Sequence, residues 1–73
     1  MADYYPLIAK AVMGLNALDR RTLYERGRNA LMAELKTITP PLRQSDITKE
    51  LLAFEHAVQK VEAEIARRAR ESK

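Results

Sequence analysis

The 73-residue chain contains no cysteine and no tryptophan. It has only one histidine, two glycines and three prolines. Without cysteine it can form neither a disulfide nor a thiolate metal site, and it has no cysteine nucleophile. So few glycines and prolines argue against a turn-rich all-β fold. No apolar run approaches the roughly 20 residues that span a bilayer, so we expect no membrane insertion and no signal peptide.

What remains is the composition of one small folded domain, residues 1–73. Hydrophobic residues make up 47% of the chain and charged residues 32%, which argues against disorder. A chain of this size buries only about 60% of the surface that it exposes when unfolded. Its stability is therefore marginal, and association with a partner or a second copy would add to it.

Apolar residues recur with the helical period in three segments, which predicts an all-α fold with helices near residues 4–15, 19–38 and 46–70. Asp3 is the expected N-cap of the first helix, and Gly14 and Asn16 are expected to close it. Asp19 is the expected N-cap of the second, with Leu18 and Leu23 as a hydrophobic staple.

Pro40-Pro41 end the second helix, and Ser45 or Asp46 caps the third. The short linker 39–44 makes these two helices antiparallel neighbours. The predicted architecture is a small three-helix bundle, or a helical hairpin with a short N-terminal helix packed across it. The inferred register places Gly27 opposite Val58. Gly27 is then explained by close helix packing, although a hinge or mere tolerance of glycine remain alternatives.

The third helix has an a/d heptad pattern over nearly three heptads. This narrow apolar stripe is suited to antiparallel docking on one neighbour or to a self-paired coiled coil. We therefore treat it as a candidate self-association seam, formed by Ile47, Leu51, Phe54, Val58, Val61 and Ile65.

No catalytic, cofactor-binding or metal site is expected, and the chain is not predicted to be an enzyme. His56 lies at an outward heptad position without a partner. Glu34 falls within the apolar stripe of the second helix, where a tyrosine or arginine should satisfy it if it is buried. The carboxylates of the third helix flank the seam, where charged residues normally select a partner; they are Glu50, Glu55, Glu62 and Glu64.

Arginines crowd the start of the second helix, where they oppose the helix dipole. They could pair with glutamates of the third helix, or join the basic tail 67–73 in a patch for nucleic acid. The net charge of +3 is modest for a phosphate-binding domain. The candidate basic patch consists of Arg20, Arg21, Arg28, Arg67, Arg68 and Arg70.

Three apolar residues, Met13, Met32 and Leu52, project away from the main stripes. Scattered exposed apolar residues are ordinary, but together these three would form a candidate partner patch.

The segments 4–12, 21–26 and 60–64, which read YYPLIAKAV, RTLYER and KVEAE, resemble a family of small helical proteins of α-proteobacteria. The chain also resembles N-terminal segments of longer proteins, and the family has no assigned activity. The resemblance implies an adaptor or interaction role in the bacterial cytoplasm.

The sequence therefore predicts a non-catalytic protein-interaction module that self-associates through the seam of the third helix. The alternative is weak nucleic-acid binding by the arginines of the second helix and the tail.

Overall fold

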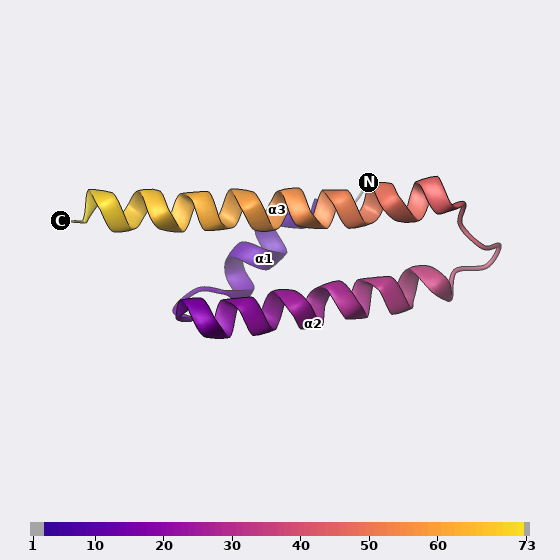
Figure 1. Cartoon of the computed structure of the whole chain (residues 1–73), viewed down its shortest axis with the longest axis horizontal. Coiled ribbons are helices and arrows are strands. Elements are labelled where there is room, and N and C mark those ends of the chain that lie inside the picture. The colour runs from indigo at the N-terminus through magenta and orange to yellow at the C-terminus, as the bar shows by residue number, and fades with distance from the viewer. Residues whose placement is uncertain (1–2, 73) are drawn as a thin grey trace.

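The computed structural model describes residues 3–72, which form three α-helices and no strand. The helices are α1 (Tyr5–Ala11), α2 (Ala17–Lys36) and α3 (Gln44–Glu71). Helices α2 and α3 lie side by side and antiparallel, α1 leads from α3 to the start of α2, and α3 extends past that start (Figure 1). The predicted small all-α, three-helix fold is confirmed.

Helix α1 is shorter than the sequence predicted, ending at Ala11 rather than near residue 15. The chain turns at Gly14, which has a φ of +82°, in the left-handed region that favours glycine. At the other end, the Asp3 carboxylate accepts a hydrogen bond from the Tyr5 amide at 3.1 Å. Asp3 thus satisfies a first-turn amide as expected, although Tyr4 occupies the N-cap position.

Helix α2 begins earlier than predicted because Asn16, not Asp19, is its N-cap. Asn16 has an extended backbone, and its side-chain oxygen accepts a hydrogen bond from the Asp19 amide at 2.8 Å. The predicted staple is absent, since Leu18 is 72% exposed. Asparagine and aspartate cap about equally well, and the Asp19 carboxylate instead complements the helix dipole within the first turn.

The connection between α2 and α3 spans residues 37–43, a little earlier than predicted. Helix α2 ends at Lys36, and α3 begins at Gln44 with Arg43 as its N-cap. Neither Ser45 nor Asp46 caps α3, because both lie within its first turn. The helix nevertheless gains a favourable dipole interaction from the Asp46 carboxylate.

The core is thin, and the molecule is elongated, with extents of 51 × 19 × 15 Å. Helices α1 and α2 both pack on α3, but their backbones do not approach one another closely. Leu35 is buried separately from the main cluster. That cluster consists of Ile8, Val12, Tyr24, Phe54, Ala57 and Val61.

Gly27 lies against the Phe54 ring and not against Val58 as the inferred register had it. A Cβ atom built on Gly27 would be 3.1 Å from Phe54 Cζ and 3.4 Å from Cε2. The aromatic ring extends farther from its own backbone than a valine side chain, so it occupies the space that the missing Cβ leaves. Close packing, the explanation favoured from the sequence, therefore holds with a different neighbour.

We predict that Gly27→Ala destabilises the fold by about 1 kcal/mol. Overpacking costs roughly 1–3 kcal/mol, and the better helix propensity of alanine offsets about 1 kcal/mol of this. Urea unfolding monitored by circular dichroism measures the change. In a Phe54→Leu background, where the smaller side chain leaves room, the same alanine should be neutral or stabilising. A higher melting temperature for the single variant would contradict close packing.

Candidate functional site

Two tyrosines attach α1 to glutamates of α3. The Tyr4 hydroxyl donates a hydrogen bond to the Glu50 carboxylate at 2.5 Å, and the Tyr5 hydroxyl donates one to Glu64. The Tyr4 ring also meets Phe54 edge to face, with 5.9 Å between centroids. The Lys60 ammonium lies 4.5 Å from the centroid of the Tyr5 ring, within cation–π range. These contacts hold a helix of only seven residues in place, which would be too short to be stable alone.

Glu62 is the main polar contact between α2 and α3. It accepts hydrogen bonds from Arg20 Nε at 2.8 Å, from Arg20 Nη2 at 3.3 Å and from the Tyr24 hydroxyl at 2.6 Å. Arg20 Nη1 also donates to the carbonyl of Leu15 at 3.2 Å, which ties down the turn before α2. About two turns after Arg20 in α2, and about two turns before Glu62 in α3, Arg28 pairs with Glu55.

The protonation equilibria of these groups reflect their partners. The Arg20 guanidinium and the Tyr24 hydroxyl lower the pKa of Glu62, although partial burial opposes them. Burial and then the hydrogen bond to Glu62 raise the pKa of Tyr24 to about 12. Burial and then Glu50 raise the pKa of Tyr4 to about 12 as well. All three groups therefore keep the charge state that makes their hydrogen bonds at neutral pH.

The arginines of the candidate basic patch are divided between two environments. Arg20 and Arg28 form ion pairs between helices, which is the structural explanation weighed from the sequence. Exposed pairs within one helix join Arg21 to Glu25 and Arg67 to Glu71.

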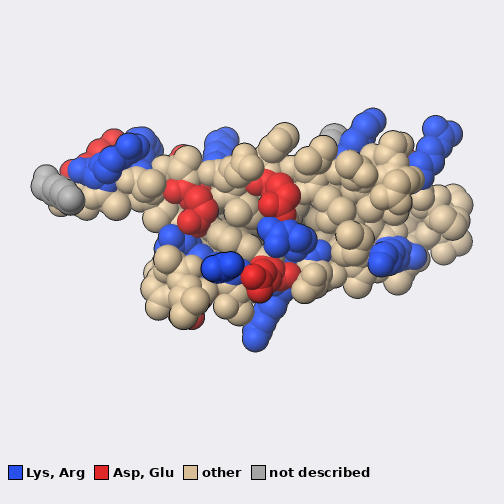
Figure 2. Space-filling view, viewed as in Figure 1, with Lys and Arg blue, Asp and Glu red and all other residues tan. Residues whose placement is uncertain are grey.

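Figure 2 shows blue and red side chains adjoining along the boundary of α2 and α3, and blue ones gathered toward the C-terminal end of α3. Arg68 and Arg70 are exposed in that end of the helix. Lys73 of the predicted tail lies outside the described residues.

Most of the candidate self-association seam faces the interior of the molecule. Phe54 and Val61 are buried, and Val58 and Ile65 pack against the same cluster. Ile47 and Leu51 are half-buried. Of the two uses that the heptad pattern allowed, antiparallel docking on a neighbour within the chain is the one in the structure. The buried face also includes Ala57, because α3 receives two helices and not one.

Two residues of the candidate partner patch, Met13 and Leu52, are not brought together. Met13 is 78% exposed beside Val61 and Ile65, whereas Leu52 lies about 13 Å before Val61 along α3 at 1.5 Å per residue. Met32, expected to project outward, is half-buried.

Two polar residues singled out from the sequence are exposed. His56 lies on the surface as expected. Glu34 is exposed too, so it needs no partner from the core.

An apolar hollow separates α1 from α2, and we call it the α1–α2 groove. It has a volume of about 290 Å³, its floor includes Phe54 and Tyr24, and Leu7 lies at its edge with 69% of its surface exposed. Glu34 is the one charged residue in the lining. The other lining residues are Tyr4, Ile8, Ala11, Leu23, Gly27, Ala30 and Leu31.

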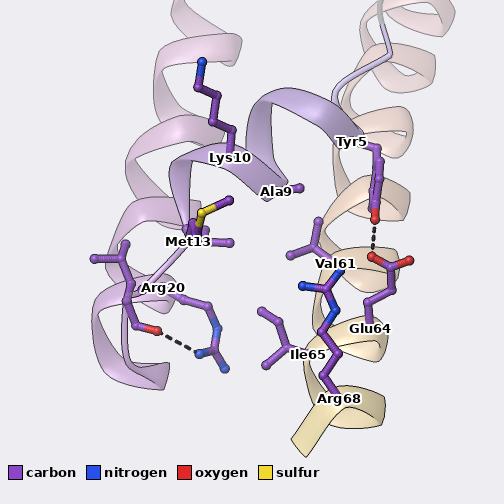
Figure 3. Close-up of a pocket in the computed structure, with 12 residues that line it drawn as sticks. Tyr5, Ala9, Lys10, Met13, Arg20, Val61, Glu64, Ile65 and Arg68 are labelled. Atoms are coloured by element: carbon purple, nitrogen blue, oxygen red, sulfur yellow. Dashed lines mark hydrogen bonds between the residues drawn. The ribbon is translucent and has the colours of Figure 1, made fainter.

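A second hollow lies between α1 and the C-terminal half of α3, and we call it the α1–α3 cavity (Figure 3). Its volume is about 390 Å³. The apolar part of the lining consists of Ala9, Val12, Met13, Leu15, Val61 and Ile65, with Gly14 beside them. The polar part consists of Tyr5, Lys10, Arg20, Glu64 and Arg68.

Within residues 3–72, no three His, Asp or Glu side chains are grouped so that they could hold a metal ion. In the same range, no helix has the length and apolar composition needed to cross a membrane.

Sequence reasoning did not identify the two hollows or the tyrosine–glutamate bonds. A signal for the bonds was present, because tyrosines on core faces need partners for their hydroxyls. The glutamates that flank the apolar face of α3 are well placed to supply them. The hollows have no comparable signal, since they depend on where α1 crosses the other helices.

We predict that stability falls as the solution is acidified, and that Glu62→Gln weakens this dependence. The folded pKa of Glu62 is lowered, so its contribution is present above an unfolded pKa of about 4.3 and is lost as pH falls through the lower folded value. Urea midpoints measured between about pH 6 and pH 3 test this. Glu71→Gln, at an exposed pair, is the matched control. If both variants kept the parent's acid dependence, Glu62 would not be the main polar contact that stabilises the packing of α2 on α3.

No protein-family model, curated protein or solved structure matches this chain. The proposals below therefore rest on the residues and the surface of this chain alone.

Proposed function

We propose that this chain is a non-catalytic interaction module that pairs with a second copy of itself through the α1–α2 groove. The observation that carries the proposal is an apolar hollow of about 290 Å³ with an exposed leucine, Leu7, at its edge. A contiguous exposed apolar surface in a soluble protein commonly marks a contact site, and the leucine adjoins such a surface here. The polar groups of this hollow do not suggest catalysis, because Tyr4 and Tyr24 already donate to glutamates.

The exposed area supports association. The chain exposes 5772 Å², whereas a compact monomer of 8.3 kDa exposes about 4,600 Å². The radius of gyration of 14.0 Å likewise exceeds the roughly 11 Å expected for 73 compact residues. The excess area, about 1,200 Å², is larger than the roughly 800 Å² that one partner buries in a standard interface.

The shape and charge of the groove favour a second copy as its occupant. A two-fold interface uses the same patch on both subunits, so it needs a projection and a hollow side by side. Leu7 supplies the projection, and the space above Gly27 and Phe54 supplies the hollow. With Glu34 as the one charge in the lining, two chains of net charge +3 meet there without facing clusters of cations.

Association through the groove leaves the intramolecular core intact. Association through the seam of α3 would instead require α1 and α2 to detach, because Phe54 and Val61 are buried beneath them. We therefore move the proposed self-association from the seam to the groove. We propose the bacterial cytoplasm as its location, from the resemblance noted in the sequence.

We predict a reversible dimer whose dissociation constant rises tenfold or more in Leu7→Glu. Burying a leucine contributes about 1.5–3 kcal/mol, and 1.4 kcal/mol corresponds to a factor of ten in affinity. Sedimentation equilibrium over a wide concentration range measures the constant.

Leu18→Glu is the matched control, because Leu18 is as exposed as Leu7 but does not line the groove. It should leave the dimer unchanged. A chain that stays monomeric at every concentration would rule out the proposal, as would equal effects of the two variants.

A further inference from the structure

The α1–α3 cavity lies on a different side of α1 from the groove. Tyr5, Ala9 and Met13 of the α1 segment face the cavity, whereas Leu7 and Ala11 line the groove. The two hollows can therefore bind different occupants, and an inference about the cavity does not rest on dimerisation through the groove.

The cavity combines an apolar floor with a cationic edge. Lys10, Arg20 and Arg68 line it against one carboxylate, Glu64, a balance of 3 − 1 = +2. Glu64 already accepts a hydrogen bond from Tyr5, and Arg20 is held by Glu62. Among the described residues, Lys10 and Arg68 form no ion pair. Arg68 extends from α3 toward Val61 and the α1 side of the cavity in Figure 3.

The helix dipole explains part of this arrangement. Arg68 and Arg70 lie in the last turns of α3, where cations are favourable. The dipole does not account for an arginine that lines an apolar cavity, because an outward position such as that of Arg70 would serve equally well. Arg68 lines the cavity and Arg70 does not. We therefore attribute the position of Arg68 to the cavity and not to the helix dipole.

The surface continues beyond the cavity along α3. Helix α3 extends past the start of α2 (Figure 1), and its residues 66–72 are all exposed. They span about 10 Å at 1.5 Å per residue. The face that carries Ile65 continues three and four residues later as Arg68 and Ala69. Arg70 is only two residues from Arg68 and therefore lies on another face of the helix, outside the proposed surface.

We propose that the α1–α3 cavity and the adjoining end of α3 bind an acidic amphipathic helix of a partner protein. An apolar side chain of that helix occupies the cavity between Val12 and Ile65, and its carboxylates pair with Lys10 and Arg68. Helix-in-groove recognition uses apolar anchors spaced three or four residues apart. The partner helix then lies along the free end of α3. A surface that extends beyond the cavity favours such a segment over a compact small molecule.

Fluorescence anisotropy with a labelled amphipathic peptide tests the proposal. The probe is a helix of leucine, alanine and glutamate of about 14 residues, which spans about 21 Å. Two comparison peptides replace each glutamate with glutamine or with lysine. The acidic peptide should bind, the glutamine peptide should bind at least tenfold more weakly, and the lysine peptide should not bind.

Arg68→Glu should weaken binding of the acidic peptide at least tenfold, and Arg68→Gln by a smaller factor. Arg70→Glu is the matched control, since it makes the same charge change on the same free end but does not line the cavity. It should change the affinity less than threefold. Unchanged helical circular dichroism would establish that each variant is folded.

Three results would overturn the proposal. These are no binding of the acidic peptide, equal binding of the glutamine peptide, and equal losses in Arg68→Glu and Arg70→Glu. Binding of an unrelated DNA duplex more tightly than the peptide, with both arginines contributing equally, would identify a nucleic-acid surface instead. Leu7→Glu should bind the peptide as the parent does, so failure of either proposal is distinguishable from failure of the other.

Discussion

The packing of this molecule depends on the contact between Glu62 of α3 and the pair Arg20 and Tyr24 of α2. Each of the six clustered core residues keeps some exposure to solvent, and the least exposed, Val12 and Val61, are each 3% exposed. A core this thin leaves the relative position of two antiparallel helices weakly specified. The hydrogen bonds to Glu62 specify it further, because a shift of one turn would separate the carboxylate from both donors. The pair formed by Arg28 and Glu55 repeats the constraint nearer the middle of the hairpin.

Hydrogen bonds to glutamates of α3 also determine where α1 lies. Tyr4 and Tyr5 donate to Glu50 and Glu64, which are 14 residues apart and therefore about 21 Å along α3. A seven-residue helix held at its start by both bonds lies on α3 and leaves the space toward α2 unfilled. The groove and the cavity are thus two consequences of one placement.

Several elements of this fold could be predicted from local pattern alone. The breakers at Gly14 and Pro40-Pro41 separate three helical segments, and the glutamates beside the apolar face of α3 indicated interhelical pairs with the arginines of α2. The start of α2 could not be predicted reliably, since Asn16 and Asp19 cap equally well and the choice depends on the turn that precedes them. The partner of Gly27 depended on a register that linker length does not determine. The hollows depended on the crossing of α1, which is specified by tyrosine hydroxyls that pair across 46 and 59 residues of sequence.

We propose that two copies meet at the α1–α2 groove and not at the candidate self-association seam of α3. Isotope-filtered nuclear Overhauser spectroscopy on a mixture of carbon-13-labelled and unlabelled chains distinguishes these two surfaces. We expect intermolecular contacts between the methyl groups of Leu7 in one chain and those of Leu23 and Leu31 in the other. Intermolecular contacts confined to Leu51 and Val58, or none at concentrations that populate a dimer, would contradict this proposal.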